Sequence, residues 1–527
     1  MKSVMKHQFS QVPHADIPRS RFDRSHGCKT TFDAGYLVPI YVDEVLPGDT
    51  FNLRATIFAR LATPIHPFMD NIFLDTFFFA VPIRLIWDNW QKFNGEQVNP
   101  GDSTDFLVPT MTSPAVTGYV NSELSDYFGL PTEVVGLTHM SLYHRAYNLI
   151  YNEWFRDQNM QNSVTVDKDD GPDDPADYVL LRRGKRHDYF TSALPWPQKG
   201  PAVELPLGTE APVKGIGKWD STWTAGPDQW YESDGTRPTY QSYMSINATT
   251  GLNNLYAVEE NTSITGHPGI YADLSQATAA TINALRQAFQ IQKLYERDAR
   301  GGTRYTEVIR AHFGVTSPDA RLQRPEYLGG GSTPINVNPI AQTSESGTTA
   351  QGNLAAFATA TAQGHGFTKS FTEHCVIIGM VSARADLNYQ QGLNRAFSRS
   401  TRWDYYWPAL SHIGEQAILN KEIFADGSAN DEDVFGYQER YAEYRYKPSQ
   451  ITGQFRSNFA TSLDTWHLAQ DFSALPALND AFIREDPPID RVIAVNTEPH
   501  FILDGYINLQ CARPMPVYSV PGLIDHF

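Results

Sequence analysis

The sequence predicts a mainly β fold, an antiparallel sandwich whose strands are joined by long connections. Residues 51–61 alternate between apolar and polar side chains almost strictly, which is the period of a half-buried strand. Residues 72–81 are nearly all apolar, as expected for a strand that is covered on both faces. The candidate strands lie far apart along the chain, so antiparallel pairing is favoured over repeated β–α–β units.

Further strands are expected in the second half of the chain. The apolar run from Cys375 to Val381 predicts a strand within residues 371–383. Residues 491–495 and 505–511 predict a last pair of strands, and the second of these alternates between apolar and polar side chains.

Helices are expected inside the connections. Apolar and aromatic residues recur every three or four positions over 139–155, which gives a helix one buried face. A second helix is predicted over 303–313 with a stop at Gly314, and a third is predicted to begin near residue 273 and to end near Gly301.

Composition excludes several classes of protein. The chain has 527 residues and a hydrophobic fraction of 41%, which is enough for a sizeable core. It lacks both an apolar stretch long enough to span a membrane and a signal-peptide pattern at its start, so no membrane insertion is expected. Three widely spaced cysteines disfavour a disulfide framework and a cysteine-based zinc site, and they fit an intracellular origin. A net charge of −17 disfavours a protein that coats nucleic acid with its whole surface.

Two segments differ in character from the rest. Residues 1–31 form a basic N-terminal arm, which is either a disordered terminus or a contact to phosphate or to a neighbouring subunit. Its candidate DNA-contacting cations are Lys2, Lys6, Arg19, Arg21, Arg24 and Lys29. Residues 157–270 form an irregular insertion with an acidic cluster at 167–177, and residues 329–366 form a second loose segment. The insertion contains four candidate receptor-binding tryptophans: Trp196, Trp219, Trp223 and Trp230.

Catalytic chemistry is not predicted. Residues 364–370 lack the Gly-Lys-Ser order of a phosphate loop. His374 and Cys375 are neighbours on a predicted strand and therefore point to opposite faces, so Cys375 is interpreted as a core residue. The acidic cluster lacks the order of a calcium loop and is interpreted as solvated. We therefore expect no catalytic residue, no cofactor and no metal site.

Aromatic residues make up 12% of the chain and often lie beside arginine. This combination is typical of protein interface cores and also of stacking platforms for single-stranded nucleic acid, while ordinary core packing remains open for any single residue. The candidate subunit-interface residues are Arg402, Trp403, Tyr405, Tyr406, Trp407, Tyr441, Tyr444 and Arg445.

Long sequence blocks carry a family resemblance. One of them is Arg145-Ala-Tyr-Asn-Leu-Ile-Tyr-Asn-Glu-Trp-Phe-Arg-Asp-Gln-Asn159. The others cover residues 82–96, 301–314, 407–417, 435–448 and 463–472. With these blocks the chain resembles the major capsid protein of gokushoviruses, small tailless single-stranded DNA phages of the Microviridae. The blocks follow the family order and frame nearly the whole chain except 160–270 and 329–366.

The resemblance implies an eight-stranded antiparallel jelly roll with long, helix-containing insertions, formed by residues 32–156 and 271–527. It implies a T=1 icosahedral shell of this chain in a virion capsid that assembles in the host bacterial cytoplasm. The insertion at 157–270 would form a surface protrusion near the threefold axes. The implied partners are further copies of the chain, an internal scaffolding protein, a DNA pilot protein, a small basic DNA-binding protein, the packaged circular single-stranded DNA and a host cell-surface receptor.

Charge suggests an orientation for the subunit in such a shell. About sixty copies would together carry a net charge of roughly −1,000. DNA inside the shell must therefore meet local basic surface, bound cations or a basic peptide. We expect the N-terminal cations to face inward and the acidic cluster to face outward. The alternative function is a carbohydrate-active or carbohydrate-binding β-sandwich, since tryptophan-rich loops and scattered carboxylates occur in such proteins.

Overall fold

The computed structural model describes residues 18–203, 282–316 and 323–518, together with short strands between residues 213 and 272. The chain divides into two compact units. The first comprises Met1–Pro197 and Gly301–Phe527, and the second comprises Gln198–Arg300. The predicted insertion of 157–270 therefore spans both units, because residues 157–197 belong to the first; its role as a surface protrusion stays a prediction.

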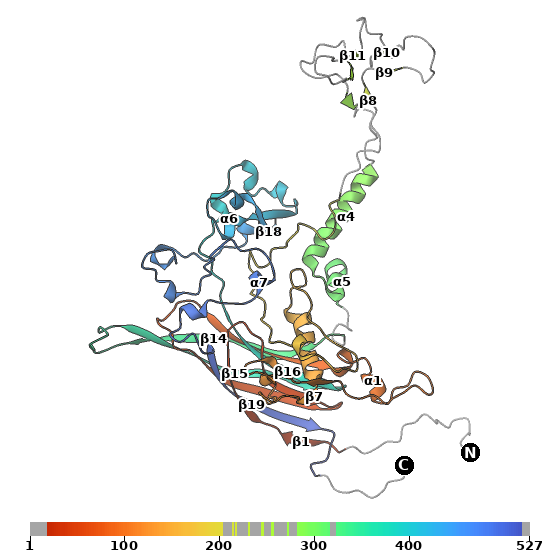
Figure 1. Cartoon of the computed structure of the whole chain (residues 1–527), viewed down its shortest axis with the longest axis vertical. Helices are drawn as coiled ribbons and strands as arrows, with labels where there is room; N and C mark the ends of the chain where they lie inside the picture. The colour runs from red at the N-terminus through yellow and green to blue at the C-terminus, as the bar shows by residue number, and fades with distance from the viewer. Residues whose placement is uncertain are drawn as a thin grey trace. The chain divides into compact units, whose positions relative to one another are not determined.

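One antiparallel sheet dominates the first unit (Figure 1). Its main path runs in the order β1-β19-β4-β15-β14-β5-β16-β3, and β2 pairs with a second stretch of β19. The nine strands are β1 (Ser20–Asp23), β2 (His26–Phe32), β3 (Val38–Val45), β4 (Thr50–Leu61), β5 (Ile72–Pro82), β14 (Glu326–Ala341), β15 (Leu354–Ser370), β16 (Cys375–Ala385) and β19 (Phe501–Arg513). The mainly β, antiparallel fold with helix-containing connections is confirmed, with nine strands in this sheet instead of eight.

Strict alternation of burial explains the central strands. On β4 every second residue from Phe51 to Leu61 is buried, and the intervening residues are exposed. Strand β19 shows the same alternation from Phe501 to Cys511. The buried faces of these strands and of β3, β5, β15 and β16 enclose one apolar core. The sequence predictions for 51–61, 72–81 and 505–511 are confirmed, and the strand predicted within 371–383 begins at Cys375.

Three segments differ from their predictions. Part of the predicted arm, residues 20–23 and 26–31, lies in β1 and β2, and both strands pair with β19. The loose segment 329–366 lies mainly in β14 and β15, where glycine allows a close approach: at Gly330 (φ +154°) an added Cβ would lie 2.0 Å from the carbonyl oxygen of Thr76. Residues 491–495 form no regular strand. Pro487 and Pro488 lead into a 3₁₀ turn at Ile489–Arg491, and the chain continues from this turn as a loop.

Helices pack on the sheet and fill the connections. Helix α3 (Leu142–Ile150) continues into a π-helical turn at Tyr151–Phe155, and its buried face contributes to a second apolar core with Trp87. Helix α5 (Tyr305–Phe313) ends at Gly314 in the left-handed conformation, as predicted. Helix α4 spans Ile282–Gly301. The short helices are α1 (Trp90–Phe93), α2 (Leu124–Tyr127), α6 (Asn420–Ile423) and α7 (Asp480–Ile483).

A third apolar cluster lies beneath the β17–β18 hairpin. The hairpin of β17 (Glu415–Leu419) and β18 (Val434–Glu439) packs with α6 and with the loop around Phe190.

The remaining strands are β6 (Thr110–Thr112), β7 (Thr138–Met140), β8 (Val213–Lys214), β9 (Gly217–Lys218), β10 (Trp230–Tyr231), β11 (Met244–Ile246), β12 (Leu255–Ala257) and β13 (Tyr271–Ala272). In the part of the chain that is described, no helix is long and apolar enough to cross a membrane.

Candidate functional site

Two loops beside the β17–β18 hairpin form a surface of arginine and aromatic side chains, here called the Arg–aromatic surface and defined as residues 397–407 and 440–445. A 3₁₀ turn at Arg402–Asp404 shapes the first loop. The Asp404 carboxylate accepts hydrogen bonds from the backbone N–H groups of Thr401 (2.7 Å) and Ser400 (3.0 Å). These bonds lower the pKa of Asp404 to about 2, so the loop is fixed by a carboxylate that stays ionised.

The rings of the two loops interlock. Tyr406 lies edge-on to Tyr441, with ring centroids 5.4 Å apart, and Tyr444 lies 6.3 Å from both. The Tyr441 hydroxyl donates to the carbonyl oxygen of Trp403 at 3.0 Å. Tyr441 is buried and holds a left-handed backbone conformation (φ 63°), so it serves as the internal support of this surface.

Arginine side chains stack over the exposed rings. The Arg399 guanidinium lies 4.3 Å from the ring centroid of Tyr444, and that of Arg402 lies 4.7 Å from the centroid of Trp407. Trp403, Tyr405, Tyr406, Trp407 and Tyr444 nevertheless remain between 43% and 59% exposed. A cluster of ordered, half-exposed aromatic and arginine side chains is the composition of a protein interface core.

Most of the predicted interface residues therefore lie together. Arg445 lies on the same loop but takes no part in the stacking: it forms an ion pair with Glu439 and has no stacking contact within the described residues. Sequence reasoning did not select Arg399, whose guanidinium also lies 5.3 Å from the Tyr405 ring. The signal was its place just before the aromatic run, but only the fold brings it onto Tyr444.

The predicted DNA-contacting cations occupy different environments. Arg24 donates to both carboxylate oxygens of the buried Asp43, at 2.6 and 2.9 Å, so its charge is already matched. Lys29 pairs with the exposed Asp504 at 2.6 Å. Arg21 donates to the Gln510 side chain at 3.0 Å, and Arg19 donates to Thr50 at 3.4 Å. Lys2 and Lys6 lie outside the described residues.

The tryptophans of the insertion are only partly described. Trp196 is half-buried in the first unit, and Trp230 lies in strand β10 of the second. Trp219 and Trp223 lie outside the described residues. A shared receptor-binding role for these four side chains stays a prediction.

The acidic cluster at 167–177 is not wholly solvated, so its prediction as a solvent-facing loop is wrong for part of its length. Asp173 is buried and accepts two hydrogen bonds from the buried Arg145. The Asp170 carboxylate accepts a 2.7 Å hydrogen bond from the Trp87 indole. Asp173 is buried because Arg145, which is itself buried on α3, requires an anion beside it. The other five acids of the cluster, residues 167, 169, 170, 174 and 177, are not buried, although Asp170 is held by its hydrogen bond from Trp87.

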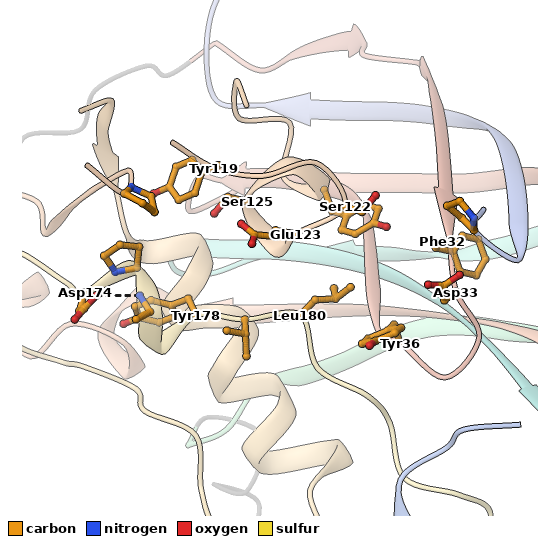
Figure 2. Close-up of a pocket in the computed structure, with 16 residues that line it drawn as sticks. Phe32, Asp33, Tyr36, Tyr119, Ser122, Glu123, Ser125, Asp174, Tyr178 and Leu180 are labelled. Atoms are coloured by element: carbon orange, nitrogen blue, oxygen red, sulfur yellow. Dashed lines mark hydrogen bonds between the residues drawn. The ribbon is translucent and has the colours of Figure 1, made fainter. Parts of the chain in front are cut away.

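A cavity of 590 Å³ opens where the β2–β3 connection meets the loops around residues 119–125 and 174–180 (Figure 2). Its walls include aromatic rings, and three carboxylates lie at it: Asp33, Glu123 and Asp174. Each carboxylate accepts a hydrogen bond from a backbone N–H group, at 3.0, 3.1 and 2.9 Å respectively. These carboxylates thus fix the local loops. Nowhere in the described ranges does a group of three or more histidine, cysteine or acidic side chains form a metal site.

Comparison with known proteins identifies the family. The model of the family described as "Capsid protein (F protein)" matches residues 10–523. The chain is 51% identical to capsid protein VP1 of Bdellovibrio phage phiMH2K, over 99% of this chain and 98% of that protein. It is 46% identical to capsid protein VP1 of Chlamydia phage 1 (99% and 98% covered) and 37% identical to that of Spiroplasma virus 4 (98% and 97%). These full-length matches favour a capsid protein over the carbohydrate-active or carbohydrate-binding alternative. The chain therefore belongs to the capsid protein (F protein) family, together with the capsid proteins of the gokushoviruses.

Proposed function

We propose that this major capsid protein closes a T=1 icosahedral shell of about sixty copies around a circular single-stranded DNA genome, and that its role is architectural, without catalysis. The Arg–aromatic surface carries the proposal of self-assembly. Its rings are held in place by ring and guanidinium contacts within the subunit, so little side-chain entropy is lost when a neighbour covers them. A subunit that meets several identical neighbours needs such prepared contact surfaces.

The long connections support the same proposal. Loops longer than about 12–15 residues inside a compact domain are usually functional. Here the connections between β5 and β14 and between β16 and β19 hold most of the helices, the β17–β18 hairpin and the Arg–aromatic surface. We infer that these excursions cover shell area and grip neighbouring copies.

Further partners follow from charge and from the resemblance to gokushoviruses. Sixty subunits at −17 each repel phosphate on average, so we expect a small basic DNA-binding protein inside the shell, beside local basic surface on this chain. An internal scaffolding protein and a DNA pilot protein complete the proposed assembly in the host bacterial cytoplasm. The insertion at 157–270 is proposed as the outer protrusion that binds the host receptor.

The assembly proposal is tested by mixing the purified full-length chain with its scaffolding protein. A shell of sixty 59.1 kDa subunits has a mass of roughly 3.5 MDa. We expect a closed particle of that mass in sedimentation and in negative-stain micrographs. A chain that stays monomeric, or that forms open sheets or filaments with the scaffolding protein present, contradicts the T=1 proposal.

The receptor proposal needs its own experiment. Replacing Trp196, Trp219, Trp223 and Trp230 by alanine should abolish adsorption to host cells while particle yield stays unchanged. Unchanged adsorption of these particles would contradict receptor binding through the tryptophans.

A further inference from the structure

The sheet has a second, exposed face that the proposed interface does not use. This face is formed by the side chains of β1, β2, β4, β15 and β19 that point away from the core. We call it the outer face, a name that refers to the core of the subunit and not to the outside of the shell. It carries four apolar or aromatic side chains that are 40–61% exposed: Ile502, Tyr506, Phe58 and Phe357. Exposed apolar side chains gathered on one face of a sheet indicate a contact with something outside the subunit.

The charge of the outer face is opposite to that of the chain. Its strands present four cations (Arg21, Lys29, Arg54 and Arg60) and two carboxylates (Asp23 and Asp504), although the whole chain carries −17. Lys29 and Asp504 neutralise each other, whereas Arg54 and Arg60 have no ion-pair partner among the described residues. These two arginines are six residues apart on β4, about 20 Å along the strand.

The aromatic rings on this face also lack partners. In the register of the two strands Phe58 lies opposite Asp504, and Tyr506 lies opposite Thr56, so the two rings are diagonal neighbours. Neither ring contacts another ring within the described residues. On the Arg–aromatic surface, in contrast, guanidinium groups already cover the rings. The rings of the outer face are therefore free to stack on flat groups of a partner.

Hydrogen-bonding side chains surround the two rings. They project from β4, β15 and β19, and they are Asn52, Thr56, Thr361, Gln363, Asn508 and Gln510. Unpaired arginines, isolated rings and amide or hydroxyl side chains on the exposed face of a sheet are features with which proteins bind single-stranded nucleic acid. A neighbouring copy of this acidic chain would find less to pair with, since the face is polar around its few apolar groups.

We infer that the outer face, centred on Arg54, Phe58, Arg60 and Tyr506, is the surface on which this subunit holds single-stranded DNA. This inference rests on the proposed function of enclosing such a genome. Bases would stack on Phe58 and Tyr506, and phosphates would pair with Arg54 and Arg60. Of the predicted cations, Arg21 and Lys29 lie at the rim of the same face, whereas Arg24 is held by Asp43.

The test uses the full-length chain in two forms, as free subunits and as assembled particles. The charge variant is R54Q/R60Q and the ring variant is F58T/Y506T, in which threonine keeps strand propensity. The matched control is K168Q/K447Q, which removes two exposed cations from elsewhere on the first unit. Free subunits are titrated with an oligodeoxythymidine strand at several salt concentrations, and particles are cross-linked by ultraviolet light and digested.

We expect cross-links to peptides of β4 and β19 in wild-type particles. The slope of log affinity against log salt should shrink by roughly 1.4 in R54Q/R60Q, since two phosphate contacts are lost at about 0.7 each. The ring variant should bind tenfold or more weakly with the slope unchanged. The control should match the wild type in both measurements, and all variants should form particles in normal yield.

Three results would overturn the inference. The first is cross-links that map only elsewhere, and the second is wild-type affinity and slope in both variants. The third is a loss of particle yield in R54Q/R60Q with normal oligonucleotide binding, which would identify the face as a subunit contact. A chain that binds the oligonucleotide through this face but never closes a shell would contradict the proposed function and leave the DNA surface standing.

Discussion

Arg145 on helix α3 and Asp173 in the loop that follows it form an ion pair with 0% and 1% of their side-chain surface exposed. The Arg145 guanidinium also donates to the carbonyl oxygens of Ile86 and Asp169, at 3.1 and 2.8 Å. Asp173 accepts a further hydrogen bond from the Tyr178 hydroxyl at 2.9 Å. This ion pair therefore connects the loop around Asp173 to helix α3, which packs on the sheet.

Replacing Arg145 by methionine should destabilise the subunit by about 3–5 kcal/mol, because Asp173 would remain buried without its cation. The free energy of unfolding, measured in urea on unassembled subunits, checks this value. The control is Lys29→Met, which breaks an exposed pair and should cost about 1 kcal/mol or less. The double variant R145M/D173L should recover much of the loss. A loss in R145M no larger than in the control would show that the pair contributes little.

A second expectation concerns the pH dependence of folding. Burial, with the neighbouring His139, lowers the pKa of His144 from 6.5 to about 3, although the Asp173 charge acts in the opposite direction. The unfolded chain binds this proton near pH 6.5, so between pH 6.5 and 3 the unfolded state binds more protons than the folded one. Stability from this residue is therefore present above pH 6.5 and falls with decreasing pH, by at most about 1.4 kcal/mol per pH unit.

The variant His144→Gln isolates this contribution from that of the carboxylates. Its free energy of unfolding should decrease less steeply than that of the wild type between pH 6.5 and 4. At neutral pH the variant should be less stable, since the 2.9 Å hydrogen bond between His144 and Ser125 is disturbed. Parallel stability curves for the two proteins over this range would rule out titration of His144.

Much of the fold was predictable because one physical pattern decides it. Alternation along residues 51–61 and 505–511 matches the inward and outward faces of β4 and β19. The strands at 20–32 were not predictable in the same way, since a strand at the sheet edge buries few side chains and Arg21 and Lys29 point to solvent. Nor does local sequence indicate that the glycine-rich start of β14 is a strand, because its pairing partner Thr76 is about 250 residues away.

The candidate surfaces were predictable by composition but not by geometry. Arginine next to aromatic residues in the sequence indicated the Arg–aromatic surface. Its two loops, however, come together only because β17 and β18 pair as a hairpin. The charge pattern of 167–177 concealed the burial of Asp173, because the demand for an anion comes from Arg145 on another element. The outer face was missed since its arginines and rings are spread over β4 and β19, almost 450 residues apart.

A third prediction compares two glycines of the sheet. A Cβ added at Gly379 on β16 would lie 2.7 Å from the Phe78 ring and 3.0 Å from Cβ of Tyr41, so Gly379→Ala should destabilise the subunit by about 1–3 kcal/mol. At Gly505 on β19 the nearest atom is 3.5 Å away, and Gly505→Ala should be neutral within about 0.5 kcal/mol. Urea unfolding of both variants tests the difference. Equal stability would mean that the Phe78 ring moves aside without cost.

The Arg–aromatic surface yields the last prediction, for which Arg402 and Trp407 are the test residues. Both are exposed in the subunit, so Arg402→Ala and Trp407→Ala should leave the urea midpoint of free subunits unchanged. If a neighbouring copy covers these two side chains, each alanine variant should reduce the yield of closed particles tenfold or more. A tenfold loss corresponds to about 1.4 kcal/mol of lost contact free energy. Leu107→Ala, which removes an 82% exposed side chain from another loop, is the control.

The conservative variant Arg402→Lys separates charge from stacking. Lysine keeps the charge but lacks the planar guanidinium that lies 4.7 Å from the Trp407 ring centroid. A yield as low as that of Arg402→Ala would show that the stacked geometry prepares Trp407 for its neighbour, whereas recovery would show that charge alone is needed. Normal assembly of both alanine variants would contradict a role for this surface between subunits, because exposed, preordered rings at the centre of an interface cannot be truncated without loss of contact area.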